Sequence, residues 1–376
     1  MAQLAIPRRR RFAPAKFLKR FRNRSLRYRR YPVSRVLAWL QTKKQLRELP
    51  DQAFAFPNRL YIDIINSCNS NCQLCPTGVG YKHALGRMSL EQFKSIIDQT
   101  KRKVWFVGLH SWGEPTLHPD LVEMVRYCTS QGVLTNVSSN IHTYSEEVYA
   151  GLFKARLSNL SMSLHGLSQE TYEAYRPGMK YEPNRANMER ISKLRDRLGA
   201  HGTALDMVFA VTRFNEHEVP LLKDFCGRYG IDSLTLYKAS YNARFLLKDM
   251  NLRDVSLDPQ QLRDRVRKHL DKWMAKDPQY VMPRYLDIYE NPELLLSTEV
   301  TEDCRDPWNL MYITYNGDVS PCCGSYDYGK DALGNVFRDG IFDVWNNRKY
   351  QDSRRHLKKE PCGQDTLCAS CPGALY

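Results

Sequence analysis

The chain has 376 residues, of which 42% are hydrophobic and 26% are charged. This composition is typical of a globular protein, and it excludes collagen-like, wholly disordered and multispanning membrane classes. No uninterrupted apolar run approaches the ~20 residues that a membrane-spanning helix needs. Eleven cysteines, an odd number in a chain of this length, favour metal ligation over a disulfide scaffold. We therefore expect a cytoplasmic protein whose thiols are available to metals.

The net charge of +15 is concentrated at the N-terminal end. Residues 1–49 contain 16 Lys or Arg and one acid, Glu48, whereas residues 50–376 contain 40 of each sign. The spacing of the apolar residues within 33–48 predicts a basic amphipathic helix. A partly disordered, solvated arm is the alternative. Such an arm is suited to an anionic membrane surface, a nucleic acid or a phosphate-bearing substrate.

From residue 59 onward, short β-rich runs alternate with helical patterns. Strands are expected at 60–65, 104–109, 133–138, 160–164, 205–212 and 233–237. Helices are expected at 89–100, 121–131, 146–154, 187–198 and 216–229. This alternation predicts an α/β fold, a partial (β/α)6 barrel of parallel strands, in which chemistry lies at the C-terminal ends of the strands.

The first predicted strand is followed by Cys68, Cys72 and Cys75. Three thiolates on one loop can hold a cubane iron–sulfur cluster by three corners and leave the fourth iron open. A zinc site completed by a distant residue such as His83 is the alternative.

This three-cysteine spacing after the first barrel strand resembles the radical S-adenosylmethionine (radical SAM) superfamily. The resemblance implies that the open iron of a [4Fe–4S] cluster binds the methionine moiety of SAM, and that its reduction releases a 5′-deoxyadenosyl radical. It also implies SAM contacts from six residues that match family positions. These are Gly113, Glu114, Ser139, Asn140, Ser163 and Arg176. Trp112 departs from the family pattern, because a glycine usually stands there.

A second group of cysteines lies in the C-terminal region, where Asn316 and Gly317 predict a hairpin turn. The layout resembles the SPASM and twitch extensions that carry auxiliary clusters in radical SAM enzymes. One auxiliary [4Fe–4S] cluster is expected on Cys304, Cys322, Cys368 and Cys371, leaving Cys323 and Cys362 as spare or alternative ligands. A structural zinc ribbon is the alternative. Cys128 and Cys226 are expected to be small core residues.

Four regions are therefore expected. They are a basic arm (1–50), a radical SAM partial barrel (51–240), a helical bridge (241–300) with a helix at 259–274, and a SPASM- or twitch-like domain (301–376).

An auxiliary cluster suits net two-electron oxidation, because it accepts the electron left on a substrate radical. We expect dehydrogenation or epimerisation of a small polar substrate, such as a sugar, an aminocyclitol or a phosphate-linked molecule. Cys323 is the candidate hydrogen donor for epimerisation, and a flavodoxin- or ferredoxin-type protein is the expected electron donor. A SPASM-type maturase acting on a ribosomal peptide is the first alternative. A zinc-stabilised RNA-binding protein is a remoter one, disfavoured by the neutral barrel region.

Overall fold

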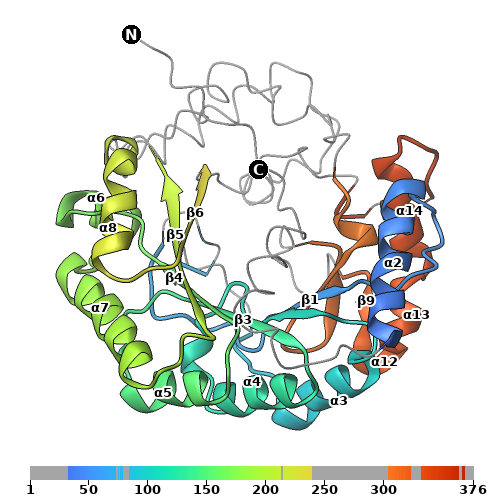
Figure 1. The fold of residues 1–376 in the computed structure, drawn as a ribbon. Helices are drawn as coiled ribbons and strands as arrows, with labels where there is room; N and C mark the ends of the chain where they lie inside the picture. Colours follow the sequence, from blue (N-terminus) through green and yellow to red (C-terminus); the bar gives the residue numbers. More distant parts are fainter. Residues whose placement is uncertain are drawn as a thin grey trace, which may run out of the picture.

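The computed structural model describes residues 33–72, 75, 77–78, 84–212, 215–238, 304–322, 332–363 and 366–368. Six parallel strands form a curved sheet with helices along its outer side (Figure 1). The strands are β1 (Arg59–Ile62), β2 (Phe106–Gly108), β3 (Leu134–Ser139), β4 (Asn159–Ser163), β5 (Ala204–Val211) and β6 (Ser233–Lys238). The connecting helices are α3 (Leu90–Thr100), α4 (Leu121–Ser130), α5 (Glu146–Lys154), α6 (Gln169–Tyr175), α7 (Tyr181–Arg197) and α8 (Leu222–Arg228). This confirms the predicted α/β half-barrel.

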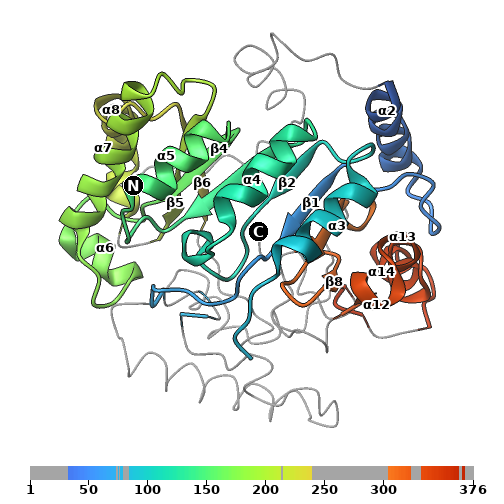
Figure 2. The ribbon, with the colours of Figure 1, turned by 90° about the horizontal axis from the view of Figure 1, so that it is seen from below.

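Alternation along the strands divides the sheet into two faces, because successive side chains point to opposite sides. Leu60 and Ile62 of β1 are fully buried in the apolar layer beneath the helices. The intervening Tyr61 faces the inner side. Ser161 and Asp206 stand beside each other there in the register of β4 and β5. Seen from below, the outer helices wrap the sheet as a single layer (Figure 2). The inner face is therefore the polar one, as a binding surface requires.

Local sequence signals account for where several helices begin. Ser89 caps α3 in a capping box with Gln92, and Ser168 caps α6 in the same way with Thr171. The helix expected at 187–198 begins earlier, at Tyr181, because Pro183 is tolerated in the first turn of a helix. The helix expected at 216–229 is divided into a 3-10 turn (Glu216–Leu221) containing Pro220 and then α8.

The C-terminal part extends the same sheet. Strand β7 (Leu310–Ile313) pairs in parallel with β1, and β8 (Asp318–Ser320) and β9 (Gly334–Asn335) continue the sheet antiparallel. The predicted turn joins β7 to β8, with Gly317 at φ +89°, a left-handed conformation that favours glycine. A 3-10 turn (Asp306–Trp308) precedes β7, and α12 (Val336–Asp339), α13 (Ile341–Trp345) and α14 (Arg348–Leu357) follow β9. The barrel and the C-terminal domain thus share one sheet within the described residues.

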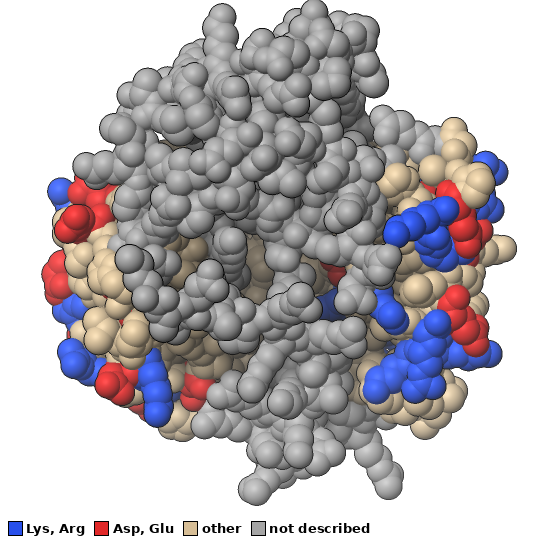
Figure 3. Space-filling view, turned by 90° about the horizontal axis from the view of Figure 1, so that it is seen from above, with Lys and Arg blue, Asp and Glu red and all other residues tan. Residues whose placement is uncertain are grey.

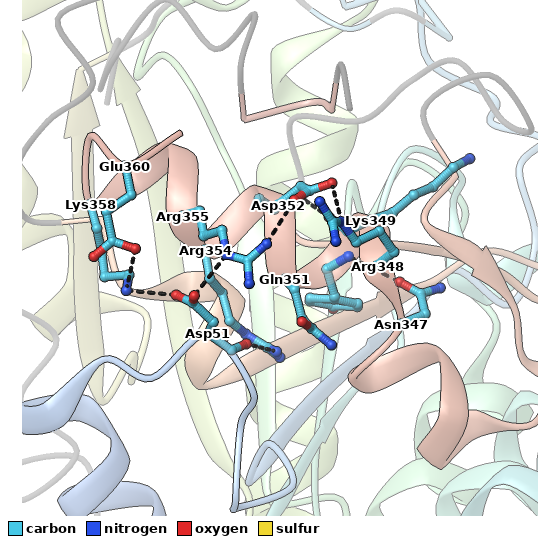
Figure 4. A network of polar contacts seen from close by, with 12 residues as sticks. Asp51, Asn347, Arg348, Lys349, Gln351, Asp352, Arg354, Arg355, Lys358 and Glu360 are labelled. Atoms are coloured by element: carbon cyan, nitrogen blue, oxygen red, sulfur yellow. Dashed lines mark hydrogen bonds and ion pairs between the residues drawn. The ribbon is translucent and has the colours of Figure 1, made fainter. Parts of the chain in front are cut away.

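Polar contacts from α14 attach the C-terminal domain to the segment before β1 (Figure 4). Asp51 accepts from Arg355 Nε at 2.7 Å and pairs with Lys358 Nζ at 2.6 Å. Although burial opposes the effect, these two cations hold the pKa of Asp51 below its ordinary value. Buried Arg354 donates to the carbonyl oxygens of Asp51 and Pro307, both at 2.9 Å. These bonds fix the orientation of α14 relative to the barrel.

Helix α2 (Val33–Glu48) has the predicted bounds and lies at the periphery (Figures 1 and 2). Arg35 is 2% exposed and donates to the carbonyl oxygens of Lys101, Gln131 and Gly132, near the C-terminal ends of α3 and α4. Gln45 donates to the carbonyl oxygens of Ala55 and Trp308, so α2 contacts both the barrel and the C-terminal domain. Within the described residues, no helix is long and apolar enough to cross a bilayer.

Acidic and basic side chains alternate along the described rim of the molecule (Figure 3). This mixture agrees with the balanced charge of residues 50–376. The helix predicted at 259–274 lies outside the described residues, as do residues 1–32.

Candidate active site

The three N-terminal cysteines lie on the loop that follows β1. The backbone N–H of Cys75 donates to the carbonyl of Cys72 at 3.1 Å, and Ser70 Oγ lies 3.2 Å from Cys72 Sγ. Burial, together with nearby negative charge, raises the pKa of Cys68 to about 11 and that of Cys75 to about 12; the charge comes from Glu114 and Cys72 for Cys68, and from Cys72 and Cys68 for Cys75. Among the described residues, no three side chains of the thiol, imidazole or carboxylate type lie close enough together to hold one metal ion. These desolvated thiols need a cationic centre to hold them as thiolates.

Gly113 brings the turn after β2 against this loop. A Cβ on Gly113 would lie 1.8 Å from the carbonyl oxygen of Ile65, so only glycine permits the approach. The neighbouring Glu114 N–H donates to the carbonyl of Ser67 at 2.9 Å. The glycine therefore positions the Glu114 carboxylate beside the cysteine loop.

Glu114 is a buried carboxylate, only 2% exposed. Its oxygens accept from the backbone N–H of Asn140 at 2.7 Å and from the hydroxyl and N–H of Thr116 at 2.7 and 3.1 Å. These donors are uncharged, and Glu114 forms no ion pair with a described Lys or Arg, so burial raises its pKa. The site therefore offers a buried negative charge that a ligand's ammonium group would compensate.

The turn after β3 places Asn140 over the cysteine loop. Asn140 Nδ2 donates to Asn69 Oδ1 at 2.7 Å and lies 3.6 Å from Cys68 Sγ. Ser139, by contrast, is buried on the outer face, where its hydroxyl accepts from the N–H of Ile141 at 3.0 Å. Ile141 has φ +52°, which is strained for a β-branched residue. Ser139 thus supports the turn from behind rather than facing the inner side, and its hydroxyl also hydrogen-bonds the Glu114 carboxylate.

Sequence reasoning did not identify the residues that hold this strained turn. Asn187 of α7 donates to the carbonyls of Ile141 and His142 at 3.0 and 3.2 Å, and Asn184 donates to the carbonyl of Asn140 at 3.2 Å. Both belong to a helix whose predicted start lay at residue 187. The only sequence signal is the pair of asparagines three residues apart at the start of a helix.

Arg176 lies at the end of α6 and is 2% exposed. It donates to the carbonyl of Ser163 at 3.0 Å and to the hydroxyl of Tyr172 at 3.1 Å, while its Nε has no hydrogen-bond partner. Ser163 therefore meets Arg176 through its backbone. A buried guanidinium with an unused donor can bind a ligand carboxylate.

Polar side chains link Arg176 to the cysteine loop. Tyr172 Oη lies 3.4 Å from His142 Nδ1, and His142 Nε2 lies 3.3 Å from Ser70 Oγ, which contacts Cys72. Burial, aided by the charge of Arg176, lowers the pKa of His142 to about 3, so its imidazole is neutral. This chain of contacts was not predicted, because its members come from three separate loops and helices.

The second cysteine group flanks the hairpin of β7 and β8 and continues toward the C-terminus. Cys304 precedes β7 and Cys322 follows β8, so the hairpin brings them to the same end of the sheet. The charges of both Cys322 and Cys368 raise the pKa of the Tyr350 phenol, an effect added to that of burial. Cys362 is exposed. Cys323, the candidate hydrogen donor, and Cys371 lie outside the described residues.

The two remaining described cysteines are apart from both groups. Cys128 on α4 and Cys226 on α8 are buried in the apolar layer, as expected.

The residues of this site fit a [4Fe–4S] cluster that binds the methionine moiety of SAM, as the cysteine spacing implies. Three partly buried thiols, a buried carboxylate without a described cationic partner and a guanidinium with a free donor lie at the C-terminal ends of strands that form one edge of the sheet. An amino acid carries an ammonium group and a carboxylate on one carbon. The Glu114 carboxylate can bind the ammonium group, and the Arg176 guanidinium can bind the carboxylate.

Comparison with known families assigns both regions. Residues 62–226 match the family model "Radical SAM superfamily", and residues 304–372 match SPASM, "Iron-sulfur cluster-binding domain".

Three curated relatives align over most of both chains. They are a tungsten-containing aldehyde ferredoxin oxidoreductase cofactor-modifying protein of Pyrococcus furiosus (24% identity; 77% of this chain, 81% of the relative), a PqqA peptide cyclase of Streptomyces rochei (23%; 84% and 83%) and an AdoMet-dependent heme synthase of Methanosarcina barkeri (27%; 85% and 92%).

The fold is also found among solved structures. Streptococcus suis SuiB bound to precursor peptide SuiA superposes with a TM-score of 0.59 at 17% identity, over 95% of this chain and 82% of that one. The chain therefore belongs to the radical SAM superfamily. More particularly, it is a SPASM-containing radical SAM enzyme, which uses S-adenosylmethionine and [4Fe–4S] clusters.

Proposed function

We propose that this enzyme abstracts hydrogen from a peptide substrate and oxidises it, as a SPASM-type maturase. The observation that carries the reaction class is the buried Glu114 carboxylate beside three partly buried thiols, without a described cationic partner. The peptide is supported by the PqqA peptide cyclase, which aligns over 84% of this chain. The inner face of the half-barrel, which carries hydrogen-bonding side chains, is the surface on which such a substrate would lie.

Cys68, Cys72 and Cys75 would hold the SAM-cleaving cluster. Glu114 would bind the ammonium group of the methionine moiety, and Arg176 its carboxylate through the unused Nε. Gly113 and Ser139 would act by shaping the backbone around Glu114. The auxiliary cluster would be held by Cys304, Cys322, Cys368 and Cys371.

When bound and reduced, the cluster and SAM would supply a 5′-deoxyadenosyl radical that takes a hydrogen atom from the substrate. Each turnover would consume one electron from a low-potential donor of flavodoxin or ferredoxin type. The auxiliary cluster would accept the electron that remains on the substrate after it loses a proton.

The residues around the first cluster keep its electrostatics fixed. Asn140 Nδ2 points at Cys68 Sγ, and Ser70 points at Cys72. Hydrogen bonds to cluster sulfurs raise a reduction potential, because they stabilise the extra negative charge. We infer that Asn140 acts on the potential of the cluster in addition to holding Glu114 through its backbone.

The small polar substrate that we expected from the sequence has less support from these relatives than a peptide has. A second candidate is a porphyrin, favoured by the heme synthase relative, which aligns over 92% of its own length. Both remain distinguishable from a peptide by direct assay.

The test uses anaerobically reconstituted enzyme with SAM and a strong reductant. Synthetic peptides encoded beside the gene are compared with a porphyrin and with nucleotide sugars. A peptide should accelerate 5′-deoxyadenosine release and lose two hydrogens by mass spectrometry. Modification of only the porphyrin or the sugar would refute the peptide assignment.

A further inference from the structure

Helix α2 is mounted with its polar side toward the protein. Its buried side chains are Arg35, Ala38, Thr42 and Gln45. Its apolar side chains face outward instead, with exposed fractions of 73% for Val33, 40% for Val36, 53% for Leu37 and 50% for Leu40. We call these four residues the outer stripe. An ordinary surface helix is arranged the opposite way, because apolar burial against the core is what stabilises it.

The polar contacts explain how this orientation is held. Arg35 donates hydrogen bonds to three carbonyl oxygens of the barrel, and Thr42 Oγ1 lies 3.4 Å from the carbonyl oxygen of Phe56. Gln45 both donates to and accepts from the backbone of Ala55. If α2 rotated about its axis to bury its apolar side chains, Arg35 would lose these hydrogen bonds or be buried without partners, at a large cost in free energy. The outer stripe is therefore held in an outward position.

Exposed bases border the outer stripe, and the one acid of the helix, Glu48, lies at its C-terminal end, where it pairs with Lys44. Lys44 and Arg47 are exposed and continue it along the same helical face, and Lys43 is exposed beside Trp39, 4.2 Å from its ring centre. The preceding residues 1–32 contain 12 Lys or Arg and no acid. An apolar face bordered by many bases is the pattern of a helix that lies in the interface of an anionic bilayer.

We propose that α2 docks this protein on an anionic lipid surface through the outer stripe, with the exposed bases of the same helix, Lys43, Lys44 and Arg47, binding the headgroups. Aliphatic side chains offer nucleic acid no stacking surface, so the stripe does not fit RNA. A second copy of this chain would bring the same excess of positive charge face to face. The lipid surface alone satisfies both the apolar and the basic elements. This inference is independent of the substrate proposed above.

The test is co-sedimentation of the full chain with vesicles of equimolar phosphatidylglycerol and phosphatidylcholine, compared with phosphatidylcholine alone. The wild type should bind the anionic vesicles, and added salt should weaken binding. The double variant Leu37→Glu, Leu40→Glu should lower the partition coefficient at least ~10-fold. Leu198→Glu is the matched control, because Leu198 is 39% exposed at the end of α7, on the opposite side of the molecule in Figure 1, and it should bind like the wild type.

Circular dichroism and iron content verify that each variant is folded. The milder Leu37→Ser variant, with a smaller loss of binding, replaces the double variant if that does not fold. Three results would overturn the proposal. They are no binding to anionic vesicles at low salt, vesicle binding unchanged by loss of the stripe, or a dimer or RNA complex that the same substitutions abolish while vesicles remain unbound.

Discussion

Substituting Gly113 with alanine tests how closely the turn after β2 must approach the cysteine loop. The added Cβ would lie 1.8 Å from the Ile65 oxygen, 2.7 Å from the Ile65 carbonyl carbon and 3.0 Å from Asn66 Cα. All three are backbone atoms, so no side chain can rotate away. Ordinary contact requires a separation of about 3.5 Å, so the two segments must move apart by more than ~1 Å.

That movement would fall on the bond between the Glu114 N–H and the Ser67 carbonyl, which is 2.9 Å long. It would displace Glu114 from the loop that carries Cys68. A misplacement of ~1 Å near reacting groups costs on the order of 100-fold in rate, and overpacking costs ~1–3 kcal/mol of stability. We therefore expect Gly113→Ala to retain its iron but to lose about 100-fold in 5′-deoxyadenosine formation.

The assay measures SAM binding by equilibrium dialysis and 5′-deoxyadenosine by chromatography after reduction under argon. Gly227→Ala is the matched control, because a Cβ on Gly227 of α8 meets nothing within 4 Å. The control should behave like the wild type. Wild-type SAM cleavage by Gly113→Ala would refute the argument that this close approach positions Glu114.

Three further predictions concern charge and ligation. Glu114→Gln should weaken SAM binding ~10- to 100-fold in calorimetry, because the amide cannot compensate an ammonium charge; undiminished affinity would contradict the assignment. Cys368→Ala should lower the iron content from about eight to about four per chain while SAM cleavage persists, and an unchanged iron content would exclude Cys368 as a ligand. His165 accepts from the Ala210 N–H at 3.0 Å, and burial holds its pKa well below the ordinary value. The unfolded chain therefore binds the extra proton, and the free energy of unfolding should decrease as pH falls below ~6.5, by up to ~1.4 kcal/mol per pH unit from this group. His165→Asn should make that slope shallower in urea titrations, and equal slopes would contradict the argument.

The sequence predicted the parts of the fold that depend on local signals. Hydrophobic spacing and capping residues such as Ser89 located most strands and helices of the half-barrel, and the Asn316–Gly317 turn located the C-terminal hairpin. Pairing between distant segments could not be predicted in this way. Strand β7 joins the edge of β1 across about 250 residues of sequence, and no local pattern records such a contact.

The residues of the candidate site also fall into those that local sequence patterns predicted and those that they did not. The cysteine spacing and Gly113–Glu114 identified the side chains that would meet a cofactor. The residues that hold them came from elsewhere. Asn187 contacts backbone carbonyls and Tyr172 contacts a ring atom of His142, all in other segments of the chain, and no local sequence pattern records such targets. The orientation of α2 was also hidden, because the helical spacing of its apolar residues does not say which side the protein will cover.

The central claim is that Cys68, Cys72 and Cys75 hold the cluster that cleaves SAM. The most direct measurement compares 5′-deoxyadenosine release, after anaerobic reconstitution and reduction, between the wild type and Cys72→Ala. We expect the wild type to release 5′-deoxyadenosine and Cys72→Ala to release none. The variant should keep the iron of its auxiliary cluster. Release by Cys72→Ala at the wild-type rate, or zinc in place of iron in the wild type isolated without air, would contradict it.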